Sequence, residues 1–147
     1  MFKNILVPTD GSPLSLRAIR RAVQFAAEQK ARVTGFYVGP EWTPRVHGDS
    51  ILTTYVSPEK HSELVSKTAD RYLEALRKEA AAARVPCKCL HAEGNYPYEK
   101  IVKAAEQNRC DLIMMASHGR RGISKLLLGS ETAKVLAHSA IPVMVCR

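Results

Sequence analysis

Long apolar runs and aromatic residues are both scarce in this chain of 147 residues. No stretch approaches the roughly 18 uninterrupted apolar residues of a membrane helix, so we expect no membrane-spanning segment. The apolar run that opens the chain, residues 5–7, is too short for a signal peptide and is soon followed by Asp10. We therefore expect a cytoplasmic protein.

Cysteine is also sparse, because the four cysteines are too few for a disulfide scaffold in a chain of this length. Cys87 and Cys89 are separated by one residue, so on a strand their side chains would point to the same face. This spacing allows a strained disulfide but favours a pair of free thiols. No cysteine spacing resembles a zinc site, and we expect no metal site built from cysteines.

Two well-known phosphate-binding signatures are missing. The sequence has no G-x-x-x-x-G-K-[ST] loop, and no G-x-G-x-x-G follows the first apolar run. Catalytic groups are few as well. His118 is a candidate for a general base or a phosphate donor, although a histidine in an exposed loop is usually neither. We therefore predict no catalytic residue.

What is present is the composition of a soluble globular protein, with 46% apolar and 24% charged residues. The length predicts a single domain over residues 1–147. The net charge of +8 can attract nucleic acid, anionic lipid or a phosphorylated small molecule. Aromatic residues make up only 6% and do not alternate with basic ones, so nucleic acid is not the expected partner.

Strand and helix patterns alternate along the chain and predict an α/β fold. Short, continuous apolar runs are typical of parallel strands buried on both faces, and Ser-Pro pairs mark helix starts. The predicted strands are 4–8, 32–38, 87–92, 112–116 and 141–146, and the predicted helices are 13–30, 59–84, 97–108 and 130–138. Right-handed crossovers would then give a parallel sheet with helices on both faces. Residues 39–57 form the one long irregular segment, of a kind that is often functional.

In such a sheet, ligands bind beyond the carboxyl ends of the strands, where the strand order reverses. Residues 8–12 follow the first strand, and residues 117–122 follow the fourth. Asp10 either contacts a nucleotide or holds the turn between strand and helix. The residues alone do not choose between these roles.

A second candidate region is the start of the helix at residue 130. We expect Ser130 to be its N-cap, which would leave the amides of Glu131, Thr132 and Ala133 free to bind a phosphate. Gly129 would let the backbone approach the ligand closely. Further glycines and basic residues would complete the anion site: Gly119, Gly122, Arg120, Arg121 and Lys125. The alternative is an ordinary loop whose serine merely caps its helix.

The sequence resembles the universal stress protein family over about residues 3–146. The segments that carry the resemblance are residues 5–12, 117–122, 127–130 and 141–145. The resemblance implies a five-stranded parallel sheet in the order 3-2-1-4-5, a Rossmann-like fold similar to the adenine nucleotide alpha hydrolases. It also implies a homodimer, in which the last strand, 142–146, pairs with its copy in the partner chain.

Members of this family that bind ATP carry G-x-x-G, nine residues, and then G-[ST]. Here the frame falls on residues 116–119, the spacer 120–128, and Gly129 with Ser130. Ala116 replaces the first glycine of the frame. If the backbone there needs a positive φ, alanine costs on the order of 1 kcal/mol. If the glycine serves only to admit the ribose, a methyl group is a smaller obstacle.

The resemblance assigns nucleotide-binding roles to residues at the ends of three strands. Pro8, Thr9, Asp10 and Val38 would lie at the adenine and ribose end. Met115 and Ala116 would pass beside the ribose. The phosphates would be surrounded by Ser117, His118, Gly119, Arg120, Gly129, Ser130, Glu131 and Thr132. The Glu131 carboxylate is expected near the phosphates, where it would repel a triphosphate unless Mg²⁺ or an arginine intervenes.

Three functions follow from these observations. The first is a regulatory sensor of stress adaptation that binds ATP, or AMP or ADP, with Mg²⁺ on the phosphates. The second is a slow ATPase or self-phosphorylating enzyme. The third is a nucleotide-free module that binds other proteins.

Overall fold

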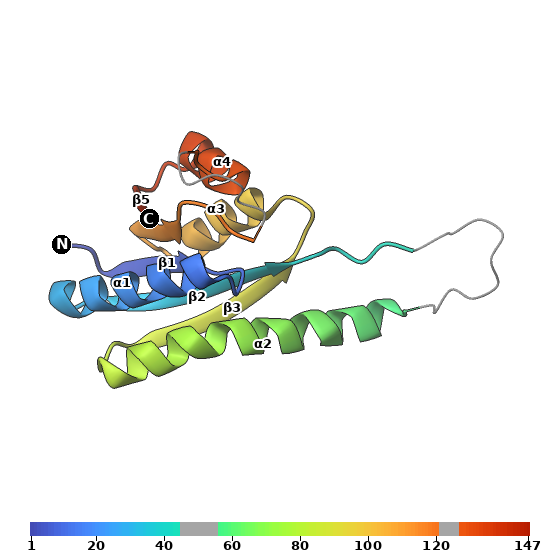
Figure 1. Cartoon of the computed structure of the whole chain (residues 1–147), viewed down its shortest axis with the longest axis horizontal. Helices are drawn as coiled ribbons and strands as arrows, with labels where there is room; N and C mark the ends of the chain where they lie inside the picture. Colours follow the sequence, from blue (N-terminus) through green and yellow to red (C-terminus); the bar gives the residue numbers. More distant parts are fainter. Residues whose placement is uncertain (45–55, 121–126) are drawn as a thin grey trace.

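The computed structural model describes residues 1–44, 56–120 and 127–147. Strands and helices alternate, as the apolar pattern predicts (Figure 1). Their order is β1 (Asn4–Pro8), α1 (Pro13–Gln29), β2 (Arg32–Gly39), α2 (Pro58–Ala82), β3 (Cys87–Glu93), α3 (Pro97–Gln107), β4 (Leu112–Ala116), α4 (Ser130–His138) and β5 (Val143–Cys146). The described helices include none that is both long and apolar enough to cross a membrane.

The five strands form one parallel sheet in the order β3-β2-β1-β4-β5, which confirms the predicted topology. β1 therefore lies at the centre, between β2 and β4. The chain moves outward from β1 to β2 and β3, and then returns past β1 to β4 and β5. The strand order thus reverses between β1 and β4, the position where open α/β sheets bind ligands.

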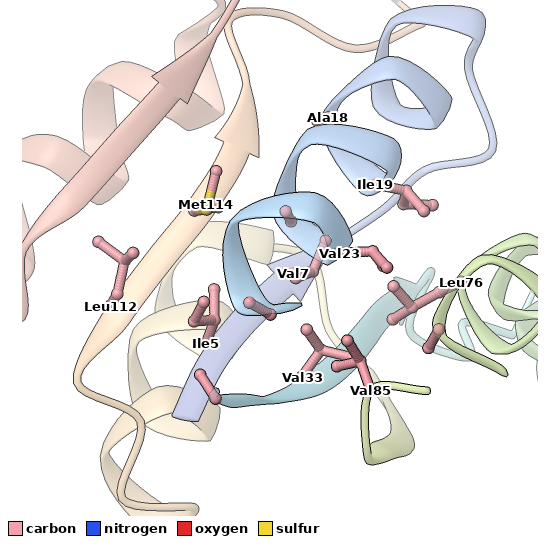
Figure 2. Packing of buried hydrophobic residues seen from close by; sticks show 14 of the residues in the cluster. Ile5, Val7, Ala18, Ile19, Val23, Val33, Leu76, Val85, Leu112 and Met114 are labelled. Carbon is pink, nitrogen blue, oxygen red and sulfur yellow. The ribbon is translucent and has the colours of Figure 1, made fainter. Parts of the chain in front are cut away.

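Helices cover both faces of the sheet. α1 and α2 pack on one face, and α3 and α4 pack on the other (Figure 1). Alternate residues of β1 serve the two layers: Ile5 and Val7 point toward α1, whereas Leu6 belongs to the core under α3 and α4. Figure 2 shows Ile5 and Val7 on the face of β1 that α1 covers. All residues of β1 and β4 are buried, as their continuous apolar runs predict.

Ser12 and Ser57 cap α1 and α2, each directly before a proline. The Ser12 hydroxyl accepts a hydrogen bond from the Ser15 amide at 3.2 Å, and the Ser57 hydroxyl accepts one from the Lys60 amide at 3.1 Å. Proline suits the first helical position because its missing N–H would have no partner there. The Ser-Pro signal thus places the start of α1 immediately after the end of β1.

Several predicted boundaries differ from the structure by one or two residues, among them the end of α2, which is Ala82 rather than residue 84. The last strand begins at Val143 rather than at Ile141, because the Ile141 amide donates to the Ser139 hydroxyl at 3.0 Å in a turn before the strand. Of the predicted irregular segment 39–57, residues 45–55 lie outside the described residues, while β2 runs through Gly39 and α2 begins at Pro58.

Candidate functional site

β1 and β4 separate at their carboxyl ends. Their pairing ends at Leu6 with Ile113, although β1 goes on pairing with β2 as far as Pro8. β4 likewise continues beside β5 as far as Ala116. The two central strands therefore stop pairing before their ends, at the point where the strand order reverses, and the loops that follow them line a crevice.

Pro8 accounts for part of this separation. In a strand, alternate amides point to opposite neighbours. The Thr9 amide donates to the Phe36 carbonyl of β2 at 2.9 Å, so the residue before it faces β4. That residue is Pro8, which has no N–H to donate. Pro8, which ends the apolar run, therefore donates no hydrogen bond to β4 at the opening of the crevice.

Thr9 and Ser12 hold the turn from β1 into α1. Thr9 is only 7% exposed, and its hydroxyl lies 3.0 Å from the Ser15 hydroxyl. The Gly11 amide donates to the Thr9 hydroxyl oxygen at 3.2 Å. Gly11 has φ +75°, and a Cβ there would lie 2.5 Å from the Tyr72 ring, so glycine is needed on both counts. Thr9 has a structural role in this turn.

Asp10 joins the two loops that border the crevice. One carboxylate oxygen accepts from the Ser12 amide at 2.9 Å, and the other accepts from the Arg120 amide at 2.9 Å. Gly119 makes this possible, because a Cβ at that position would collide with the Asp10 carboxylate. Of the two roles predicted for Asp10, the structure establishes the turn-holding one and adds a bond to the loop after β4.

These bonds govern the charge of Asp10. Burial raises the pKa of the Asp10 carboxyl, but hydrogen bonds from Ser12 and from the Arg120 amide outweigh burial and leave the pKa below its usual value. The ionised carboxylate is therefore the form that the fold favours.

The Arg120 side chain turns back over the first loop. Its Nε donates to the Asp10 carbonyl at 2.9 Å, and its guanidinium carbon lies 5.0 Å from the centre of the Tyr72 ring. Tyr72 also meets Tyr37 edge to face, with ring centres 5.4 Å apart. Neither tyrosine is among the predicted site residues. No local signal marks them, since both read as apolar-face positions of a strand and a helix.

Gly129 brings the start of α4 against the end of β4. Its amide donates to the Ser117 carbonyl at 2.7 Å. A Cβ on Gly129 would lie 2.9 Å from the His118 Cα, so a side chain would push the two segments apart. The close approach predicted for Gly129 is present, although it is to the protein's own backbone.

The expected cap of α4 is wrong by one residue. Gly129 is the N-cap, and Ser130 is the first residue of the helix. The Ala133 amide consequently donates to the Gly129 carbonyl at 2.9 Å. It is therefore not the free donor that the sequence predicts. The amides without an intrahelical acceptor are those of the first three helical residues, which are Ser130, Glu131 and Thr132.

The Glu131 side chain does not have the expected position. Its Oε2 accepts a hydrogen bond from the Tyr98 amide at 2.9 Å, at the start of α3. Tyr96, the N-cap of α3, makes no side-chain capping bond. The Glu131 side chain, which belongs to α4, supplies the acceptor at the start of α3 instead. Oε1 also lies 3.4 Å from the Lys134 ammonium. The carboxylate is therefore committed to the start of α3.

Thr132 and Ala116 connect α4 to the end of β4. The Thr132 hydroxyl is buried and donates to the Ala116 carbonyl at 2.9 Å. Ala116 is not among the described residues with positive φ, which are Gly11, Lys30, Arg84 and Arg109. Because its backbone does not require glycine, the departure from the family frame at this position carries no conformational penalty.

Val38 and Met115 lie on the sheet face covered by α3 and α4. Met115 is buried in that core, and Val38 packs against it at the end of β2. Ala116 faces the opposite core, under α1. The predicted adenine and ribose contacts thus come from three strands that end at the same edge of the sheet.

His118 lies beside a cavity of about 470 Å³ between the two loops. The ring nitrogen Nδ1 of His118 is 3.0 Å from the Ser117 hydroxyl, which belongs to a residue that is 4% exposed. The cavity is lined by Gly11, Ser12, Pro13, Leu14, His118, Gly119 and Arg120. The predicted contributors Arg121, Gly122 and Lys125 lie outside the described residues.

Comparison with known proteins agrees with this architecture. The chain matches the model of the universal stress protein family over residues 1–147. The chain belongs to the universal stress protein family. It is 34% identical over 147 residues to the universal stress protein MJ0531 of Methanocaldococcus jannaschii, a match that covers 100% of this chain and 83% of that protein. It is 32% identical over 150 residues to the universal stress protein YxiE of Bacillus subtilis, and all of both chains is covered.

Solved structures of the family share the fold. The structure of MJ0577 from M. jannaschii superposes with a TM-score of 0.78 at 29% identity, covering 99% of this chain and 95% of that one. A universal stress protein in complex with cAMP gives a TM-score of 0.72 at 24% identity, over 99% of this chain and 97% of that one. A universal stress protein from Archaeoglobus fulgidus in complex with dAMP gives a TM-score of 0.66 at 18% identity, and the match covers 99% of this chain and 98% of that one.

Proposed function

We propose that the chain binds an adenine nucleotide in the crevice between β1 and β4 and acts as a regulatory sensor in stress adaptation. The observation that carries the proposal is the start of α4. Its first three amides have no intrahelical acceptor, and it is held against the end of β4 through the Gly129–Ser117 hydrogen bond. Such a terminus is a favourable site for phosphate, because both its amides and the helix dipole attract negative charge.

The proposed nucleotide spans the crevice. Pro8, Thr9, Asp10 and Val38 are assigned to the adenine and ribose, and Met115 and Ala116 to the passage beside the ribose. Residues 117–120 and 129–132 are assigned to the phosphates. Glu131 takes part through its amide, since its carboxylate already accepts from Tyr98. That arrangement removes one objection to a triphosphate, and we favour ATP over ADP or AMP.

Three observations support an adenine nucleotide as the ligand class. Proteins of the same fold have been solved with cAMP and with dAMP. The family frame for ATP binding is present at three of its four positions, and the fourth, Ala116, needs no positive φ. Asp10 keeps acceptor capacity for a ribose hydroxyl, because each carboxylate oxygen has two lone pairs and one amide partner.

Mg²⁺ would arrive with the phosphates. The described residues contain no group of three His, Cys, Asp or Glu side chains placed to hold a metal ion. The nearby carboxylates of Asp10 and Glu131 are already hydrogen-bonded to backbone amides. Mg²⁺ retains several waters and is often bound largely by substrate phosphates, so phosphate oxygens and water would supply its ligands.

Three further properties belong to the same proposal. The chain is a single domain, acts in the cytoplasm, and forms a homodimer through the C-terminal strand, residues 142–146. β5 is an edge strand that pairs only with β4 among the described residues, and Met144 is 38% exposed on it. An apolar edge strand is suited to pairing with a second copy.

The decisive experiment is to purify the chain without added nucleotide, denature it, and identify what it releases by chromatography and mass spectrometry. ATP, ADP or AMP at about one per chain is the expected result. Protein that is purified empty would then be titrated with Mg-ATP by calorimetry. An empty protein that shows no binding in that titration contradicts the proposal, and the function would then be sought in protein partners.

A further inference from the structure

Cys87 and Cys89 form a pair of thiols on β3, away from the proposed nucleotide site. Their sulfur atoms are 3.9 Å apart, and both cysteines are free. β3 is an edge strand of the sheet, paired with β2. Cys87 is exposed, and Cys89 is of intermediate exposure. Two thiols in contact at an accessible edge can react with the same reagent in succession.

The sheet places Cys89 where its sulfur has room. Gly35 of β2 lies opposite Cys89 in the register. A Cβ on Gly35 would lie 3.3 Å from the Cys89 sulfur and 2.4 Å from a methyl carbon of Leu76 in α2, so a larger residue would crowd both. The glycine therefore leaves room for the Cys89 sulfur between the sheet and α2, near Arg77, the residue that follows Leu76.

The two thiols differ in acidity. A hydrogen bond from the Cys87 thiol lowers the pKa of Cys89, burial opposes this, and the positive charge of Arg77 lowers it further, to about 7. The same hydrogen bond raises the pKa of the Cys87 thiol. Arg77 is held in place by Asp70 at 3.3 Å and by Glu74 at 3.6 Å. Cys89 is thus the better nucleophile, because the thiolate is the reactive form.

We propose that Cys87 and Cys89 form a peroxide-reactive dithiol that closes to an intramolecular disulfide. The Cys89 thiolate attacks one oxygen of hydrogen peroxide. The O–O bond breaks, the departing hydroxide takes up a proton to become water, and Cys89 becomes a sulfenic acid. The Cys87 sulfur then attacks the Cys89 sulfur, the S–O bond breaks, and a second water leaves with the Cys87 proton. The two thiols lose two electrons, and the peroxide accepts them.

The position of the pair makes the reaction reversible. Alternate residues of a parallel strand lie about 6.6 Å apart, near the upper limit of the Cα separation that a disulfide spans. Closing the bond therefore draws the strand together, which an edge strand with one neighbour allows more readily than a central strand. A strained and exposed disulfide is readily reduced by small thiols. Cys110 and Cys146 are buried and stand alone, and they serve as internal controls.

Lys88 lies between the two cysteines and provides a direct test. The folded protein is treated with hydrogen peroxide, the remaining thiols are alkylated in denaturant, and the chain is digested with trypsin. After oxidation, peptides 85–88 and 89–100 are expected as one disulfide-linked species. Its mass should be two hydrogen atoms below the summed masses of the two reduced peptides. Reduction with dithiothreitol before alkylation separates them. Cys110 and Cys146 are expected to be alkylated throughout.

Variants separate the two roles. In Cys87→Ser, Cys89 is expected to accumulate as a sulfenic acid that dimedone traps. In Cys89→Ser, Cys87 is expected to react with peroxide about tenfold more slowly than Cys89 does in Cys87→Ser, because Arg77 both attracts and hydrogen-bonds the Cys89 thiolate. Arg77→Gln should slow alkylation of Cys89 by iodoacetamide, whereas Arg77→Lys should largely preserve the rate. Arg77 is a positioning residue in this scheme.

Three results would overturn the proposal. One is peroxide-treated protein in which both thiols are still alkylated. Another is a disulfide found between chains on a non-reducing gel, with none within the chain. The third is equal peroxide reactivity of Cys87 and Cys89 in the two serine variants. Circular dichroism of each variant establishes that it is folded, so a loss of reactivity is not a loss of structure.

Discussion

At the scale of single residues, Gly129 is the glycine of the site where a side chain would meet neighbouring backbone, the Cα of His118. Its φ of −61° is open to any residue, so the restriction comes from space. We expect Gly129→Val to fold and to lose nucleotide affinity by about tenfold or more, equivalent to at least about 1.4 kcal/mol. The side chain would force His118 and the start of α4 apart. Calorimetric titration with Mg-ATP measures the loss.

Gly94→Ala is the matched control for that substitution. A Cβ on Gly94 would meet only the flexible side chain of Lys100, so this variant should bind nucleotide as the parent does. Gly129→Ala serves as a milder second variant, and a thermal melt shows that each protein is folded. Unchanged affinity in a folded Gly129→Val protein would mean that the nucleotide binds elsewhere.

Asp10 makes a pH-dependent contribution to stability. The pKa of its carboxyl is lower in the folded chain than the ordinary 3.8, so its contribution is complete above that value and is lost as the pH falls through the folded pKa. We expect Asp10→Asn to lower the free energy of unfolding by about 1–2 kcal/mol near pH 7. Urea denaturation should show this difference shrinking below about pH 4. A difference that does not depend on pH would contradict the role of the charge.

Arg120 and Tyr72 show what local patterns leave out. The Arg120 guanidinium stacks over a ring from α2 and bonds the Asp10 carbonyl, so its charge is shared between two loops and a helix. The sequence marks Arg120 as a basic residue near glycines and predicts that it adds positive charge to the phosphate site. Its partner ring comes from a helix far away in the sequence, which no spacing rule indicates.

At the scale of elements, a side chain of α4 caps the start of α3. Glu131 near the start of α4 accepts from the Tyr98 amide near the start of α3. We expect Glu131→Ala to lower the free energy of unfolding by about 1 kcal/mol, because the first turn of α3 loses its acceptor. Glu131→Gln keeps an acceptor oxygen and should lose less. Chemical denaturation of the three proteins gives the comparison.

The same variants test where the Glu131 carboxylate points. Because it is bonded to α3, its removal should change the affinity for Mg-ATP by less than about twofold, or about 0.4 kcal/mol. A marked gain of affinity in Glu131→Ala would place the carboxylate beside the phosphates and contradict the structure. The exposed pair with Lys134 contributes little to either measurement.

At the scale of the whole molecule, the proposal of a homodimer depends on the edge strand β5. We expect sedimentation equilibrium to give twice the 16.3 kDa mass of one chain. Met144→Lys should shift the equilibrium toward the monomer, since it sets a charge in an apolar strand-to-strand contact. Val56→Lys, at an apolar residue that is likewise 38% exposed and lies before α2, away from β5, is the control. A monomeric parent protein at micromolar concentration would contradict the dimer.

Local sequence patterns were enough to predict the alternating strands and helices of a parallel sheet and the edge of that sheet where the candidate site lies. Continuous apolar runs such as residues 5–7 report burial on both faces, and Ser-Pro pairs mark helix starts, because both depend on neighbours in the sequence. The resemblance to the family added the strand order. The same local patterns placed Asp10, Gly119 and Gly129 correctly at the ends of β1 and β4 and at the start of α4.

Only the tertiary structure decided what these residues contact. The Glu131 carboxylate bonds an amide 33 positions away, and Arg120 bonds Asp10 across 110 positions. Periodicity shows which face of an element is buried, but it does not show which loop lies opposite a polar side chain. Hydrogen bonds are short and directional, so their partners depend on how the packed elements bring distant loops together. For this reason the elements that carry these residues were predictable, whereas the directions of the charged side chains were not.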